Sequence, residues 1–155
     1  MSPHPSVPLS APAPARALER AVAHVRAGGL LILPTDTVYG IGALASDAAG
    51  VSRLLAAKGR DRRMPPPVLV ADPAQAADVV ARLPDAARAL IGAFWPGALT
   101  LVLDARADLD WDLGESGGTV ALRMPDHPLA LELLRRTGPI TKRSEERRVG
   151  KECRS

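Results

Sequence analysis

Two hydroxyl side chains and a carboxylate directly follow an apolar stretch near the start of the chain. Leu30–Leu33 is a run of four apolar residues, which suits a strand buried on both faces. Pro34 ends the strand because proline has no backbone N–H to donate. Thr35, Asp36 and Thr37 then stand at the carboxyl end of that strand, where open α/β sheets bind ligands. Thr and Asp also build ordinary turns, so the spacing alone leaves a ligand site and a plain strand–turn both open.

Two glycines and a basic pair extend this candidate site. Gly40 and Gly42 predict a Gly-rich turn, since glycine permits unusual backbone angles and close approach of a ligand. Lys58 and Arg60 follow a predicted helix. The lysine ammonium is a compact charge and the arginine guanidinium can form two parallel hydrogen bonds, so the pair could bind phosphate or carboxylate. Cations also stabilise the carboxyl end of a helix through its dipole. Lys58 is the first lysine of a chain that otherwise uses arginine before residue 142, which indicates that this position requires an ammonium. Together with the motif match described next, this observation favours the ligand-binding interpretation.

Four motifs occur in an order that resembles a known family. They are PTDTVYGIG at 34–42, KGR at 58–60, FWPGALT at 94–100 and VALRMP at 120–125. Together they are similar to the motifs of the YrdC-like family, the threonylcarbamoyl-AMP synthases that begin the threonylcarbamoyladenosine modification of transfer RNA. The resemblance runs from about residue 17 to residue 140, and four ordered motifs are far more specific than any one alone.

The resemblance assigns roles to five residues. It makes Lys58 and Arg60 the catalytic residues, which also bind the nucleotide. It makes Thr37 and Arg123 contacts of the threonine substrate, and Thr119 a second nucleotide contact. For Arg123, the alternative is a charge that simply emerges at a sheet edge.

The resemblance also implies a fold and a reaction. The fold is α/β, a YrdC-like twisted mixed sheet flanked by helices around a concave cavity. The reaction joins L-threonine, bicarbonate and ATP, releases pyrophosphate and needs no protein nucleophile, only positioning and stabilisation of phosphate charge. We expect Mg²⁺ to accompany ATP, and no metal bound by the protein itself. The expected partners are downstream proteins of threonylcarbamoyl transfer to tRNA, and a direct tRNA or double-stranded RNA contact.

Hydrophobic periodicity and turn residues predict alternating helices and strands, which indicates a sheet covered by helices. Trp95 is expected to pack in the core beside a rigid turn, and no strand is expected after Pro139. The predicted helices are 16–27, 47–57, one from 72–73 onward, 85–94 and one from 126 onward; the predicted strands are 30–33, 67–71, 98–103 and 119–123.

Composition limits the function classes. A chain of 155 residues with 46% hydrophobic residues suits one globular domain. No apolar run reaches the roughly 18 residues of a membrane helix, and a single cysteine allows no internal disulfide. We therefore expect a cytoplasmic protein without a membrane partner. Residues 1–15 are Ser/Pro/Ala-rich and predict a flexible extension.

The end of the chain differs from the rest. Residues 143–155 hold five basic and three acidic residues, no alanine and the only cysteine, Cys153. The stretch is similar to a foreign sequence that recurs at the ends of broken reading frames, and the family's Ser-x-Asn motif is missing after Ile140. We therefore predict a YrdC-like domain over 16–140, incomplete at its carboxyl end, and a non-native tail over 141–155. Without the 143–155 charges the net charge falls from +3 to +1, which weakens any argument for nucleic-acid binding.

Two other functions stay open. One is a carbamoyltransferase relative of the same fold, which the chain disfavours because it has no zinc-finger or acylphosphatase-like segment. The other is a non-catalytic RNA-binding module, for which steeply salt-dependent RNA binding without threonine-dependent turnover would be diagnostic.

Overall fold

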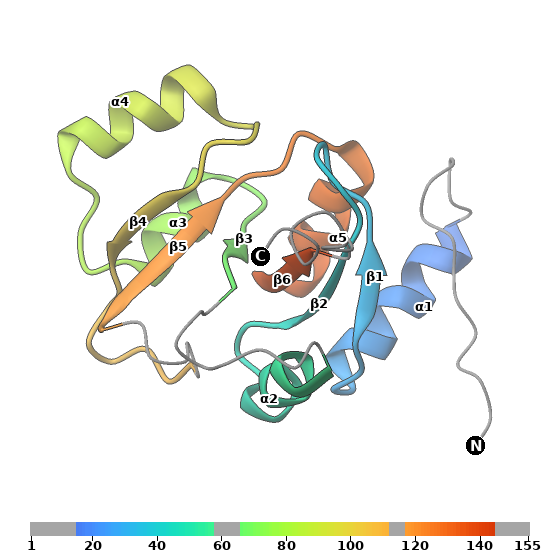
Figure 1. The fold of residues 1–155 in the computed structure, drawn as a ribbon. Helices are drawn as coiled ribbons and strands as arrows, with labels where there is room; N and C mark the ends of the chain where they lie inside the picture. The colour runs from blue at the N-terminus through green and yellow to red at the C-terminus, as the bar shows by residue number, and fades with distance from the viewer. Residues whose placement is uncertain (1–14, 58–65, 112–116, 145–155) are drawn as a thin grey trace, which may run out of the picture.

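The computed structural model describes residues 15–57, 66–111 and 117–144. Helices are interspersed with strands through this part of the chain, with β1–β2, α3–α4 and β4–β5 as consecutive elements of one kind (Figure 1). The helices are α1 (Ala15–Arg26), α2 (Ala48–Ala57), α3 (Pro73–Val79), α4 (Asp85–Phe94) and α5 (Pro128–Thr137). The strands are β1 (Leu31–Leu33), β2 (Gly40–Leu44), β3 (Val68–Leu69), β4 (Leu101–Asp104), β5 (Thr119–Arg123) and β6 (Ile140–Ser144).

The six strands form one mixed sheet in the order β1-β2-β6-β3-β5-β4. Only β3 and β5 are parallel, and the other four neighbouring pairs are antiparallel. The last described strand of the chain, β6, therefore lies in the middle of the sheet, between β2 and β3. This arrangement places residues from the start, middle and end of the chain side by side.

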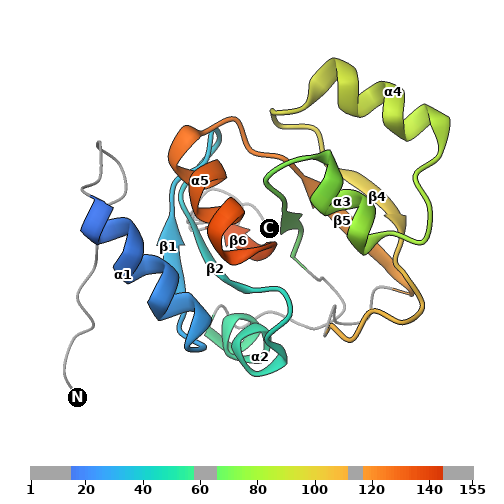
Figure 2. The same cartoon turned by 180° about the vertical axis from the view of Figure 1, so that it is seen from behind.

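The core has two parts, one for each pair of helices. The α1–α5 pair packs on the half of the sheet that contains β1, around residues such as Val25, Leu33 and Leu134, all fully buried. The α3–α4 pair packs with β4 and β5, around Val79 and Leu122. Figure 2, from behind, shows α1 and α5 on one side of the molecule and α3 and α4 on the other.

Local sequence explains where two of these helices start and stop. The Asp72 carboxylate accepts a hydrogen bond from the Gln75 N–H at 2.8 Å, and Pro73 follows it as the first helical residue, so α3 has a regular N-cap. In α5, His127 caps the start through its Nδ1, which accepts from the Ala130 N–H. Gly138 ends the helix with φ +90°, a backbone angle that residues other than glycine rarely adopt.

The predicted α/β architecture is confirmed, and so are most of its elements. The predicted helices 16–27, 47–57 and 85–94 agree with α1, α2 and α4 to within one residue at each end, and β5 matches its predicted bounds. Strand β4 begins three residues later than expected, because the backbone carbonyl of Leu99 first accepts the indole N–H of Trp95 at 2.9 Å. Trp95 is 9% exposed and contacts the α3–α4 cluster, as predicted.

Two strands were not expected. The segment predicted as a Gly-rich turn is strand β2, which pairs with β6 along its whole length and with β1 over its first three residues. Its glycines serve close strand packing: a Cβ on Gly42 would lie 2.7 Å from a methyl carbon of Ile140. The expectation that no strand follows Pro139 is also wrong, because ITKRS forms β6 despite its two cations.

The position of β6 bears on the predicted domain limits. Four residues of the segment assigned to a non-native tail, 141–144, belong to this central strand, and Thr141, Lys142 and Arg143 are all buried. Backbone pairing on both sides stabilises the strand whatever its side chains are. A boundary at residue 140 thus divides a strand of the sheet, while the division into extension, domain and tail stays a prediction.

No helix within the described ranges combines the length and apolar character needed to cross a membrane.

Candidate functional site

Strand register places two cations on one face of the sheet. Leu69 on β3 is paired with Arg123 on β5 and with Ile140 on β6. Paired residues project to the same face, and residues two apart on one strand do so too. Lys142, two residues beyond Ile140, therefore shares a face with Arg123 across the short strand β3. Both side chains are more than nine-tenths buried.

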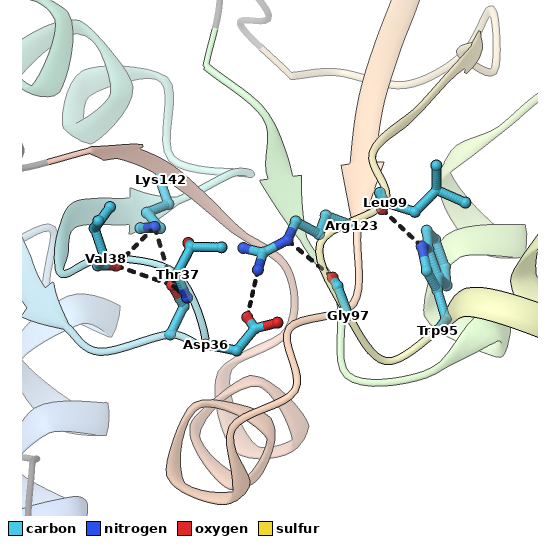
Figure 3. A network of polar contacts seen from close by, with 9 residues as sticks. Asp36, Thr37, Val38, Trp95, Gly97, Leu99, Arg123 and Lys142 are labelled. Carbon is cyan, nitrogen blue, oxygen red and sulfur yellow. Dashed lines mark hydrogen bonds and ion pairs between the residues drawn. The ribbon is translucent and has the colours of Figure 1, made fainter.

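Arg123 is held by the loop between β1 and β2. Its Nη2 donates to a carboxylate oxygen of Asp36 in an ion pair, and its Nε donates to the backbone carbonyl of Gly97 at 3.0 Å. The side chains of Arg123 and Asp36 are only 7% and 20% exposed. Figure 3 shows the guanidinium between these two partners. The ion pair and the hydrogen bond to Gly97 together join three of the predicted motifs, and the ion pair partly neutralises a buried charge.

The two threonines beside Asp36 form a chain of hydrogen bonds. Thr35 Oγ1 donates to the backbone carbonyl of Val38 at 2.9 Å and lies 3.0 Å from Thr37 Oγ1. A hydroxyl has a single proton, so the Thr37 hydroxyl must donate to Thr35 while that proton points at Val38. The lone pairs of the Thr37 oxygen are then available to a ligand, and the residue is exposed.

Lys142 donates to the same loop from the other side. Its Nζ lies 3.3 Å from Thr35 Oγ1 and 3.2 Å from the Val38 carbonyl oxygen (Figure 3). Its aliphatic part lies over Gly40, where an added Cβ would come within 2.0 Å of Lys142 Cε. Burial lowers the pKa of the Lys142 ammonium to about 8; the charge of Arg123 acts in the same direction, and that of Asp36 opposes it.

The structure brings some of the predicted site residues together and separates others. Thr37 and Arg123, the predicted threonine contacts, both lie next to Asp36: Thr37 follows it in the chain, and Arg123 forms an ion pair with it (Figure 3). Thr119 lies on the same face at the other end of β5, about 13 Å along the strand from Arg123 at 3.3 Å per residue. Lys58 and Arg60, the predicted catalytic pair, lie outside the described residues.

Sequence reasoning missed Lys142 as a member of the site. Lys142 lies in the 141–155 segment that the sequence analysis predicts to be a non-native tail, and it belongs to none of the four motifs. The available signal was non-local, since only the pairing of β6 with β3 aligns Lys142 with the face of Arg123. Asp36 was noted in its motif, but its pairing with Arg123, 87 positions later, could not be read from spacing.

The fold and the site together define an α/β protein with a polar, cation-containing site on one face of a mixed sheet. Residues 23–149 match the sequence profile of the Sua5/YciO/YrdC family, which is described as "Telomere recombination". A Mycobacterium tuberculosis protein, provisionally named a threonylcarbamoyl-AMP synthase, is 54% identical over 125 residues, which are 81% of this chain and 58% of that protein. The chain therefore belongs to the Sua5/YciO/YrdC family.

Further relatives support this membership. The threonylcarbamoyl-AMP synthase of Bacillus subtilis is 43% identical over 78% of this chain and 35% of its own length. The crystal structure of Pyrococcus abyssi Sua5 complexed with L-threonine superposes with a TM-score of 0.81 at 36% identity, covering 86% of this chain and 40% of that one. Escherichia coli YciO shares the fold, with a TM-score of 0.77 at 22% identity over 92% of this chain and 74% of that one. The chain spans about three-fifths of the length of the mycobacterial relative.

Proposed function

We propose that this chain carries the threonine-binding part of a threonylcarbamoyl-AMP synthase. The observation that carries the proposal is that Arg123 of one motif pairs with Asp36, next to Thr37, of another, so that two distant motifs form one polar site in a family whose relatives bear this name. A relative of similar fold has been crystallised with L-threonine. The proposed reaction uses L-threonine, bicarbonate and ATP and releases pyrophosphate.

The site residues suit the binding of an amino acid. Arg123 has guanidinium N–H groups beyond those used by Asp36 and Gly97, and these can donate to a substrate carboxylate. The Thr37 oxygen can accept from a substrate ammonium or hydroxyl group. The second oxygen of Asp36 can accept from the same groups, since a carboxylate has more acceptor positions than one ion pair uses. The proposed role of these side chains is therefore to orient threonine so that its amine is free to react.

The nucleotide end of the reaction depends on other residues. Thr119 lies on the face of Arg123 farther along β5, which is compatible with a ligand extended over the sheet, and Lys58 and Arg60 keep their predicted phosphate-binding role. Within the described ranges no three His, Cys, Asp or Glu residues group to hold a metal. We keep the expectation that Mg²⁺ arrives on the phosphates of ATP, where it would neutralise phosphate charge.

The wider predictions belong to the same proposal. They are a cytoplasmic location, bicarbonate and ATP as co-substrates, downstream proteins of threonylcarbamoyl transfer to tRNA, and a tRNA contact. The family relationship supports the first three, whereas the net charge of +3 gives RNA contact little support of its own.

Pyrophosphate release by the purified chain tests the proposed function. Release from ATP that requires both L-threonine and bicarbonate is the expected result. Calorimetry with L-threonine alone is the parallel measurement, because the described half of the site can bind an amino acid even where turnover needs further residues. A chain that neither releases pyrophosphate nor binds L-threonine, yet binds tRNA with a steep salt dependence, would support the RNA-binding alternative instead.

A further inference from the structure

The turn over residues 95–99, between α4 and β4, contacts the site at Gly97. The Gly97 carbonyl accepts from Arg123 Nε at 3.0 Å, and the Gly97 N–H donates to the Met124 carbonyl at 2.8 Å. Both backbone groups of Gly97 are therefore bonded to the end of β5. The Asp36 carboxylate accepts from Nη2 of the same guanidinium, so this planar group is held at two of its nitrogen atoms. Together the two bonds set the direction of the N–H groups that Arg123 can offer to a ligand.

The turn itself is held closed by Trp95. Its indole Nε1 donates to the Leu99 carbonyl at 2.9 Å, and its backbone N–H donates to the Ile91 carbonyl at 3.0 Å, at the end of α4. The indole ring packs in the α3–α4 cluster. Gly97 lies in the chain between the two residues that the indole hydrogen bond connects, and Figure 3 shows this bond and the Gly97–Arg123 bond on the same turn.

The backbone of the turn passes close to the end of α4. A Cβ added to Gly97 would lie 2.7 Å from the backbone oxygen of Phe94. The glycine therefore lets the chain fold back tightly at this point. A displacement of the turn by about 1 Å would be enough to break the 3.0 Å bond between Gly97 and Arg123.

We propose that Trp95 is a positioning residue of the site: its indole N–H holds the 95–99 turn closed, so that the Gly97 carbonyl orients the Arg123 guanidinium. The positioning rests on the hydrogen bonds described above, and its consequence for L-threonine also rests on the proposed function. Groups that bind a substrate need such support, because their own side chains must be fixed to act precisely. The alternative is that the bond to Leu99 only satisfies a buried indole N–H.

Solvent exchange of the Arg123 Nε proton, measured by NMR on the isotope-labelled chain, tests the proposal without a ligand. Arg123→Lys identifies the signal because it removes this proton. Trp95→Phe keeps an aromatic ring in the core but removes the N–H, and we expect exchange to become about 3- to 10-fold faster, as for one lost hydrogen bond. Trp111→Phe is the matched control, since Trp111 packs against the same cluster and lies outside the turn. Its effect on exchange should stay below about 2-fold.

A second Trp95 variant removes the N–H without changing the shape of the ring. The chain has two tryptophans, so in the Trp111→Phe protein only Trp95 remains. Biosynthetic incorporation of benzothienylalanine then replaces the indole N–H of residue 95 with sulfur and keeps the packing of the core. We expect this protein to show the same faster exchange of the Arg123 Nε proton as Trp95→Phe.

Three results of the exchange measurement would overturn the proposal. Unchanged exchange in both Trp95 variants would mean that the Gly97–Arg123 bond does not depend on the indole N–H. Faster exchange with phenylalanine but not with benzothienylalanine would mean that the ring acts by packing alone. Equally faster exchange in Trp111→Phe would mean that any loosening of the core releases Arg123.

Calorimetry with L-threonine separates this proposal from the proposed function. We expect Trp95→Phe to weaken L-threonine binding by about 3- to 10-fold and Trp111→Phe to change it by less than about 2-fold. L-threonine binding of unchanged affinity in Trp95→Phe would leave the turn a structural element, and the proposal would be wrong. If the Arg123 proton responds as expected but the unsubstituted chain does not bind L-threonine, the positioning role stands and the proposed substrate is wrong.

Discussion

Arg123 and Lys142 are both cations buried on one face of the sheet, and they differ in whether a neighbouring carboxylate compensates the charge. Arg123 has a carboxylate partner and a carbonyl partner, so its charge is compensated within the described residues. Lys142 has only neutral partners there, and burial lowers the pKa of its ammonium to about 8. A compensated charge fixes structure, whereas an uncompensated one destabilises the folded protein. The comparison therefore predicts opposite consequences for removing the two charges.

Removal of each charge in turn tests this contrast most directly. Arg123→Met removes the partner of the Asp36 carboxylate, whose side chain is 20% exposed, and we expect it to lower the free energy of unfolding by about 1 to 3 kcal/mol. Lys142→Met removes an uncompensated charge and leaves only neutral groups behind, so it should raise the free energy of unfolding by about 1 to 3 kcal/mol. Urea unfolding at pH 7 measures both. Equal losses would show that the two charges are not compensated differently.

The pH dependence of stability isolates the charge of Lys142. Its folded-state pKa of about 8 lies below the unfolded value of 10.5, so the unfolded chain binds more protons between these pH values. The free energy of unfolding contributed by this group should therefore rise from pH 8 to 10.5, by up to about 3 kcal/mol, and stay constant below pH 8. The measurement compares the unsubstituted chain with Lys142→Met, which shares every other titrating group. Parallel profiles for the two proteins would contradict the lowered pKa.

Gly40 offers a steric test of the path that Lys142 takes. An alanine Cβ at residue 40 would overlap Lys142 Cε and would also lie 2.7 Å from the backbone oxygen of Arg143. We expect Gly40→Ala to cost about 1 to 3 kcal/mol of stability, and Lys142→Ala in the same chain to recover part of it. Gly92→Ala is the matched control: a Cβ at that exposed position in α4 meets nothing within 4 Å, so it should stabilise by about 0.5 to 1 kcal/mol. Losses of similar size in both variants would argue against close packing at Gly40.

The sequence predicted the elements that local signals specify. The amphipathic helices, the Asp72–Pro73 start of α3 and the strand that ends at Arg123 depend on neighbouring residues, and all were found. Strands β2 and β6 were missed because neither has the alternating pattern of a half-buried strand. Glycines replace side chains in β2, and cations occupy buried positions in β6. Lys142 was missed for the same reason, since its place in the site follows from strand pairing and not from a motif.

The two threonines of the 35–38 loop should differ in the same way, one contributing mainly to stability and the other mainly to ligand binding. Thr35 is bonded to Val38, Thr37 and Lys142, so Thr35→Val should cost about 1 to 2 kcal/mol of stability while Thr35→Ser, which keeps the hydroxyl, costs less. Thr37 is exposed and gives one hydrogen bond to Thr35, so Thr37→Val should change stability by only about 0.5 kcal/mol. If the oxygen of Thr37 faces a ligand, Thr37→Val should reduce the affinity for L-threonine more than Thr35→Val does, although it has the smaller effect on stability. Thermal unfolding and calorimetric titration of the same three variants measure both orders. A Thr37→Val chain that binds L-threonine normally would leave Thr37 as part of an ordinary turn, the alternative that its spacing alone left open.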